Sequence, residues 1–310
     1  MTATLSDMIN EVSMNLSGYT LTQDRSTYLR SPVAATASSS ASPIVLSLGS
    51  TENVGKGIVE VDEELFWIDT YDRIGNTATV APYGRAYLGT TLATHAADAK
   101  VTIAPTFPRF SIKRAINDTI KGLSGILFAA DTTTITYSSA VSTYRLPATG
   151  TITGGIRNIL SVAYESVGPS KEWIPIRSWR FDSNANSTAF DSEQTISIYD
   201  MITSGRTIQI VYSKDPTAFT SNSEVFTTQT GLPESCRDLV VTGSIYRLLS
   251  NLDPARAAMV SAQADETDSK RPYGSSQSLT RQIYALYTQR LAEEVKSQQN
   301  KYPIRVHYSL

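Results

Sequence analysis

The chain has 310 residues, of which 41% are hydrophobic and 18% are charged, and its 27 basic and 29 acidic residues give a net charge of −2. This balance argues against a strongly basic nucleic-acid-binding protein, because phosphate recognition relies on a dense set of Lys and Arg. The single cysteine, Cys236, excludes an internal disulfide framework and a metal site built from several cysteines. The first ten residues lack the features of a signal peptide, and no run approaches the ~18 apolar residues of a membrane span. We therefore expect a soluble protein that is made in a cytoplasm.

Four segments carry apolar residues at the three- and four-residue spacing of an amphipathic helix. They are residues 4–16, 108–128, 233–263 and 278–300. Gly18 is expected to end the first helix, and Pro108 suits the first turn of the second. Because each apolar stripe needs a surface to pack against, we expect the four helices to form one bundle.

Two long connections between these helices contain short runs that are typical of antiparallel strands. Residues 19–106 are expected to hold about five strands. Residues 131–216 hold further runs, and Trp173, Trp179 and Phe181 are expected to fill a sandwich-like core there. Connections within a bundle usually have 2–8 residues, so each of these segments is expected to be a domain in its own right.

The expected fold class is therefore α+β, a helical bundle core with two inserted antiparallel β-modules and an extended C-terminal arm. The expected division is residues 1–18, 107–130 and 233–300 for the helical core, 19–106 for the first β-insertion, 131–216 for the second, 217–232 for a polar linker and 301–310 for the arm. The arm is expected to be extended because it contains Pro303 and alternates apolar with basic residues.

No pattern in the chain predicts a catalytic residue, a metal site or a cofactor. The stretch from Gly49 to Gly57 is similar to a phosphate-binding loop, but its glycine spacing differs and a strand, not a helix, is expected to follow. His95 has no His or Cys at metal-ligand spacing and no nucleophile motif beside it, so we interpret it as a loop histidine. Cys236 lies near the start of a helix, where a thiol can have a low pKa. A small buried apolar group is the preferred interpretation.

Five carboxylates lie close together in the first β-insertion. They are Asp62, Glu63, Glu64, Asp69 and Asp72. Two acids on one strand face are the arrangement that a glycosidase uses, but such pairs arise by chance in any acidic stretch. A solvated or channel-facing strand is the preferred interpretation.

Three features of the chain, taken together, resemble one family. The first is a helical core that is interrupted by β-insertions. The second is the stretch from Leu232 to Gly243, a proline-opened helix with small residues, which is followed by a long closing helix and a tail. The third is a G-R-x-x-x-G-T-x-x-x-x-H pattern from Gly84 to His95, which is similar to stretches of phage virion β-modules. This layout resembles the head-to-tail adaptor (connector) proteins of tailed double-stranded DNA bacteriophages.

The resemblance implies a structural virion protein with no catalytic activity. Adaptors of this family form a ring beneath the portal, usually of twelve copies, which extends the DNA channel and joins the capsid to the tail. The implied partners are the portal protein, stopper or tail proteins and further copies of the chain, while double-stranded DNA passes without sequence-specific binding. The implied location is the head-tail neck of the virion, after synthesis in the host cytoplasm, with no membrane contact.

The resemblance also implies which residues meet these partners, because the C-terminal helix and tail of the family engage the portal. The implied portal-binding residues are Leu279, Ile283, Tyr287, Tyr302, Ile304, Arg305, Val306 and Tyr308. The alternating arm suits addition as a strand to a partner sheet, and a disordered terminus is the alternative. Channel walls in the family are often acidic, which gives Asp62, Glu63, Glu64, Asp69 and Asp72 a channel-facing role.

Two other functions are compatible with the sequence. The first is another virion component, such as a tail-completion or baseplate protein, which would share the β-modules but would not require the portal. The second is a carbohydrate-binding or hydrolytic β-module on a helical stalk, which predicts an exposed aromatic platform at Trp173 or Trp179. A glycan pull-down separates this last function from the others.

Overall fold

The computed structural model describes residues 2–20, 24–147, 155–168, 171–190, 192–250 and 275–303. The fold is α+β, and its named strands pair antiparallel. The chain divides into two compact units. Unit 1 comprises Met1–Leu5, Asn117–Gly243 and Tyr284–Leu310, and unit 2 comprises Ser6–Ile116 and Ser244–Ile283. The predicted helical continuation from residue 251 to 263 lies outside the described residues.

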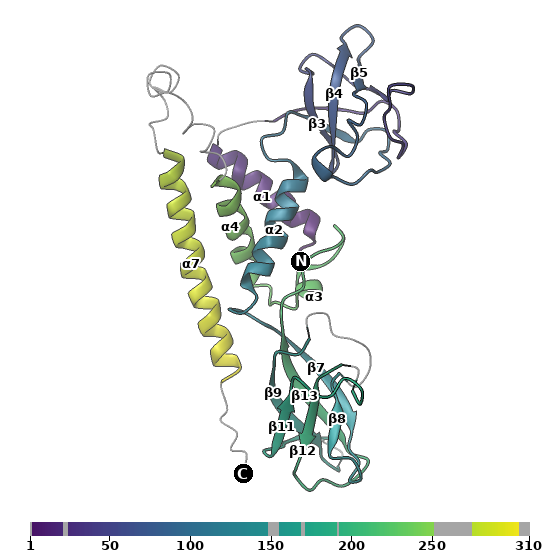
Figure 1. Ribbon diagram of the computed structural model, residues 1–310. Coiled ribbons are helices and arrows are strands. Elements are labelled where there is room, and N and C mark those ends of the chain that lie inside the picture. The colour runs from purple at the N-terminus through teal and green to yellow at the C-terminus, as the bar shows by residue number, and fades with distance from the viewer. Residues whose placement is uncertain are drawn as a thin grey trace. The chain divides into compact units, whose positions relative to one another are not determined.

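Unit 2 contains a six-stranded sheet in the order β1-β6-β3-β4-β5-β2 (Figure 1). Its strands are β1 (Arg25–Tyr28), β2 (Val45–Ser47), β3 (Gly57–Val61), β4 (Glu64–Asp72), β5 (Thr77–Val80) and β6 (Lys100–Ile103). Val59, Val61, Phe66 and Ile68 belong to its core and are almost fully buried. The sheet has one strand more than the sequence predicts, because β1 is polar and carries no apolar alternation.

Unit 1 contains a β-sandwich. Its four-stranded sheet has the order β10-β9-β13-β7 and its three-stranded sheet the order β11-β12-β8 (Figure 1). The strands are β7 (Ala129–Thr136), β8 (Thr143–Arg145), β9 (Asn158–Glu165), β10 (Trp173–Pro175), β11 (Trp179–Asp182), β12 (Thr195–Ile198) and β13 (Thr207–Lys214). One apolar cluster joins the two sheets, with Val162 and Ile210 from the first and Ile196 and Ile198 from the second.

The three aromatic residues that were expected in the sandwich core have different environments. Trp179 and Phe181 are partly buried and pack against the core. Trp173 is 43% exposed, so its expected place in the core is wrong. The reason is topological: Trp173 opens β10, the edge strand of its sheet, which has a neighbouring strand on one side only.

The helices agree with their predicted positions but differ at several ends. They are α1 (Leu5–Thr20), α2 (Arg109–Leu123), α3 (Phe226–Thr230), α4 (Cys236–Leu249) and α7 (Ser275–Lys301). Gly18 does not end α1, which continues to Thr20. α2 ends five residues earlier than predicted, and Gly125 follows in the left-handed region with φ 93°. The short helix α3 lies within the segment predicted as a polar linker, with its Phe226 fully buried.

Within unit 1, the parts of three helices that belong to it meet closely at Gly243 of α4. A Cβ atom at this position would lie 2.7 Å from Cγ2 of Thr119 on α2 and 2.8 Å from Cε2 of Tyr287 on α7. Real Cβ atoms do not approach other carbons this closely, so only glycine permits this packing. The wider arrangement of all the helices as one bundle stays a prediction. In the part of the chain that the structure describes, no helix is both long and apolar enough to cross a membrane.

We expect Gly243→Ala to lower the free energy of unfolding by about 1–3 kcal/mol, because the added methyl group overpacks the junction of the three helices. Gly18→Ala is the matched control, since nothing lies within 4 Å of a Cβ there and alanine favours a helix by up to about 1 kcal/mol. Urea denaturation of both variants measures the difference. Equal stabilisation by the two substitutions would contradict the close packing at Gly243.

Candidate functional site

A buried carboxylate organises one end of the sheet in unit 2. The side chain of Glu64, the first residue of β4, has an exposed fraction of 0%. Nε and Nη2 of Arg85 donate to its two oxygens at 2.7 and 2.8 Å. The backbone N–H groups of Ala86 and Ala93 donate to the same oxygens at 3.0 and 2.9 Å. Burial alone would raise the pKa of Glu64, but these hydrogen bonds outweigh it and lower the pKa to about 2.

Arg85 uses the rest of its guanidinium to fix the surrounding loops. Nη1 donates to the carbonyl oxygens of Ala34 at 2.7 Å and Thr36 at 3.2 Å, and Nη2 donates to that of Ala93 at 2.7 Å. The guanidinium carbon also lies 4.7 Å from the centre of the Phe66 ring. A lysine has neither the planar fork nor enough donors for this arrangement.

His95 completes the cluster by bridging two acids. Its Nδ1 lies 2.7 Å from Oδ2 of Asp62, and its Nε2 lies 3.0 Å from Oε2 of Glu64. Because a carboxylate can only accept, both ring nitrogens must carry hydrogen for both bonds to form, so the ring is the imidazolium. Burial opposes this charge, but the hydrogen bonds from His95 to Glu64 and Asp62 outweigh burial and raise its pKa.

Several residues of the G-R-x-x-x-G-T-x-x-x-x-H pattern therefore build the hydrogen-bonded cluster around Glu64. Besides Arg85 and His95, the pattern places Gly84 where a Cβ would lie 2.7 Å from the carbonyl oxygen of Trp67. The hydroxyl of Thr90 accepts a hydrogen bond from the N–H of Leu65 at 3.1 Å. His95 lies outside the named helices and strands, as the loop interpretation expects, but its side chain is buried and ion-paired, which that interpretation does not predict.

The five acidic residues of this region have different environments. Glu64 is buried in the cluster, so its expected channel-facing role is wrong: its carboxylate has no access to solvent. Asp62 is bound to His95 and remains 59% exposed, while Glu63 pairs with Lys113 at 3.1 Å. Asp69 pairs with Lys56 at 2.7 Å, and Asp72 is exposed and accepts from the N–H of Ile74. Most of these carboxylates thus have a cationic partner, which reduces the negative field of the strand.

A second carboxylate, Glu60 of β3, is buried at the start of α2 and was not singled out in the sequence. Its Oε1 accepts a hydrogen bond from the backbone N–H of Arg109, the first residue of α2, at 2.6 Å. Burial raises the pKa of Glu60 to about 7, although the N–H of Arg109 acts in the opposite direction. The glutamate alternates with valines along β3, so the sequence alone gives it the appearance of a solvent-facing position.

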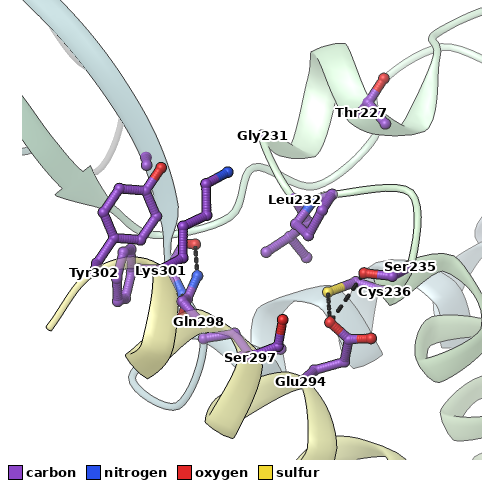
Figure 2. Close-up of a pocket in the computed structure, with 14 residues that line it drawn as sticks. Thr227, Gly231, Leu232, Ser235, Cys236, Glu294, Ser297, Gln298, Lys301 and Tyr302 are labelled. Atoms are coloured by element: carbon purple, nitrogen blue, oxygen red, sulfur yellow. Dashed lines mark hydrogen bonds between the residues drawn. The ribbon is translucent and has the colours of Figure 1, made fainter.

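A pocket of about 370 Å³ lies beside the C-terminal end of α7 in unit 1 (Figure 2). Its apolar lining includes Leu127, Phe128, Leu232 and Pro233, and Lys301 and Tyr302 come from the last turn of α7 and the residue after it. Gln298 holds this helix end in place. Its amide donates to the carbonyl of Phe128 at 2.6 Å and accepts from the N–H of Phe128 at 3.2 Å.

Cys236 and Glu294 face one another in this pocket (Figure 2). Oε2 of Glu294 accepts from the hydroxyl of Ser235 at 3.0 Å and from Sγ of Cys236 at 3.6 Å. Oε1 accepts from Nη2 of Arg290 at 3.2 Å. Burial raises the pKa of Cys236 to about 12, and the Glu294 carboxylate adds to the effect. The expected burial of Cys236 is confirmed, but the thiol makes a polar contact, and the low-pKa alternative is wrong.

The residues expected to meet the portal are only partly described. Leu279, Tyr287 and Tyr302 are half-buried, and Tyr302 lies 5.8 Å from Phe128 between ring centres. Ile283 is 2% exposed, so its side chain belongs to the core of the chain and is removed from the set of contact residues. The remaining four, Ile304, Arg305, Val306 and Tyr308, lie outside the described residues. Among the residues that are described, no three His, Cys, Asp or Glu side chains are grouped so that they could hold a metal ion.

Comparison with protein families gives a match over most of the chain. The SU10 adaptor protein family matches residues 88–306, which is more than two thirds of the chain. The chain belongs to this phage head-tail adaptor family. The match begins at residue 88, inside the pattern from Gly84 to His95, and extends through α2, the β-sandwich, α3, α4 and α7. The chain matches none of the curated proteins. The family is structural and not enzymatic, and its members act with phage portal and tail proteins in the virion neck.

We expect the His95 cluster to make the stability of this adaptor depend on pH. Because the folded pKa of His95 is raised, its contribution is fully present below the unfolded pKa of about 6.5 and is lost as the pH rises through the folded value. His95→Gln should therefore cost about 2 kcal/mol at pH 6 and clearly less at pH 9, as measured by denaturant unfolding. The chain has only one other histidine, so His307→Gln is the control. An equal cost of His95→Gln at both pH values would refute a charged histidine.

Glu60 should make stability fall with rising pH as well, but because burial favours its uncharged form. Its folded pKa of about 7 is above its unfolded value, so the folded chain binds the proton more tightly and stability falls as the pH rises through the window between them. Glu60→Gln keeps an acceptor for Arg109 without the charge. We expect it to stabilise the chain by roughly 1–3 kcal/mol at pH 8 and to have little effect at pH 4.5. Glu63→Gln, which removes a partly exposed ion pair, should show no such gain at pH 8.

Proposed function

We propose that this adaptor forms a ring beneath the portal, extends the DNA channel and joins the capsid to the tail. The observation that carries the proposal is the family match over residues 88–306, which includes α7 and the start of the C-terminal arm. The ring is proposed to hold twelve copies. Ring closure suits repeated heterologous contacts, in which one face of each subunit meets a different face of the next.

The portal contact is proposed to involve α7 and the arm. Leu279, Tyr287 and Tyr302 supply side chains that are only half-buried in the free chain. Ile304, Arg305, Val306 and Tyr308 are proposed to add to the portal by strand addition, a mode in which backbone hydrogen bonds supply affinity and alternate side chains fill pockets. The hydrogen bonds of Gln298 to Phe128 support this role, because they define the point from which the arm departs.

Four carboxylates of the first β-module are proposed to face the channel. Asp62, Glu63, Asp69 and Asp72 would repel the phosphates of passing DNA only weakly, because three of them are ion-paired, and Glu64 is left out because it is buried. Double-stranded DNA is proposed to pass without sequence-specific binding, and stopper or tail proteins to bind the ring from the other side. The proposed location is the virion neck, after synthesis in the host cytoplasm.

Negative-stain electron microscopy of the chain mixed with the portal protein of the same phage tests this function. We expect a ring on the portal that disappears when residues 304–310 are deleted. A variant with Ser309→Ala is the control for changes in this segment that keep its apolar residues. Absence of any association with the portal would refute the portal contact and favour the alternative of another tail-completion or baseplate protein.

A further inference from the structure

The pocket beside α7 has the chemistry of a peptide site rather than of a reaction centre. Several of its polar groups are already engaged: Glu294 binds Ser235, Cys236 and Arg290, and Gln298 binds the backbone of Phe128. The apolar lining residues that keep some exposure are Phe128, Pro233 and Tyr302, whereas Leu127 and Leu232 are buried. Ser297 and Lys301 also border the pocket (Figure 2). Its volume falls in the range of ligand pockets, ~300–1,000 Å³.

We propose that this pocket binds the C-terminal segment of the same chain, residues 304–310, when the adaptor is free. The chain itself delivers the segment to the pocket. Lys301 and Tyr302 line the pocket, and the segment begins two residues later. Extended chain spans about 3.3–3.6 Å per residue, so four residues reach roughly 14 Å, enough to turn back from Tyr302. A short tether of this kind gives an effective concentration of about millimolar, so even weak docking is populated.

The sequence of the segment fits an apolar pocket. Ile304, Val306 and Tyr308 are separated by single polar or basic residues, so an extended segment presents its apolar side chains on one side. Lys301 borders the pocket and carries the same charge as Arg305. The apolar side chains, not the basic ones, therefore supply the binding free energy in this proposal.

Docking in the pocket has a consequence for assembly, and this step alone rests on the proposed function. The side chains that would enter the portal cannot fill the adaptor's own pocket at the same time. The free chain would thus hold its arm in a protected state, and the portal would bind it by competition. An arm with exposed apolar residues would otherwise be open to unintended strand pairing between free copies.

A thiol placed at an exposed lining position gives a direct test in the full-length chain. Ser297 lines the pocket and is exposed, whereas Cys236, the only native thiol, is buried. In a parent chain with Cys236→Ser and Ser297→Cys, the rate of alkylation by iodoacetamide at pH 8 therefore reports on whether the pocket is covered. We expect the full-length double variant Ile304→Asp/Val306→Asp to react at least three times faster than the parent chain. A synthetic peptide of residues 303–310, added at millimolar concentration, should restore the slow rate.

A pair of tryptophan variants locates the effect in the pocket. Ser297→Trp places a bulky side chain at the pocket, whereas Gln299→Trp changes an exposed residue of α7 that does not line it. In the Ile304→Asp/Val306→Asp background, a fluorescein-labelled 303–310 peptide should bind the Gln299→Trp chain like the unsubstituted one. Its affinity for the Ser297→Trp chain should fall at least tenfold.

Three outcomes would overturn the proposal. Equal alkylation rates for the parent and the aspartate variant would mean that the segment does not cover the pocket. The same acceleration in the control Arg305→Ala would mean that apolar docking is not the cause. A parent rate that depends on protein concentration would place the segment of a second copy in the pocket. No portal is present in these assays, so their failure leaves the portal experiment unaffected, and failure of the portal experiment leaves docking intact.

Discussion

The first β-module depends on keeping one carboxylate, that of Glu64, ionised away from water. A buried charge is costly unless it is paired and fully hydrogen-bonded, and Glu64 receives hydrogen bonds from Arg85, His95, Ala86 and Ala93. The backbone must bend sharply to supply the last two: Ala86 lies in the left-handed region, with φ 50°. Such a conformation costs of order 1–3 kcal/mol, which is comparable with one hydrogen bond to a charged group. The strained loop and the buried charge therefore stabilise one another.

The end of α7 is also held by side-chain hydrogen bonds to a neighbouring part of the chain. A helix end has carbonyl groups without helical partners, and a free helix would fray there. Gln298 and Glu294 fasten the last turns to Phe128 and to the Ser235–Cys236 segment. Because these contacts lie within one unit, the start of the arm has a defined position relative to the pocket and to the first strand of the sandwich. That fixed origin is what makes a tethered segment effective, whether its partner is the pocket or another protein.

The sequence predicts the parts of this fold that have a period. The α+β class and the positions of α1, α2, α4 and α7 follow from apolar spacing, and most strands follow from alternation. The features that the sequence does not predict depend on contacts between residues that are distant in the sequence. The Gly84–His95 pattern is visible in the sequence, but its meaning requires Glu64, which precedes Arg85 by 21 residues. Trp173 is exposed because its strand is an edge, and a residue-by-residue pattern contains no information on strand order. Glutamate usually lies at the protein surface, so the sequence does not reveal that Glu60 and Glu294 are buried and hydrogen-bonded.

The family match covers the pocket and α7 but not the first five strands, and the groups with raised pKa values differ between these two parts of the chain. Strands β1 to β5 precede the matched residues 88–306, whereas the pocket and α7 lie within them. Glu60, with a pKa of about 7, and His95, with a raised pKa, are both in the unit that contains those strands. The pocket instead holds a thiol with a pKa of about 12, which stays uncharged near neutral pH. Changes of pH should therefore act on the β-module through these two groups, whereas the proposed docking of the arm rests on apolar contacts.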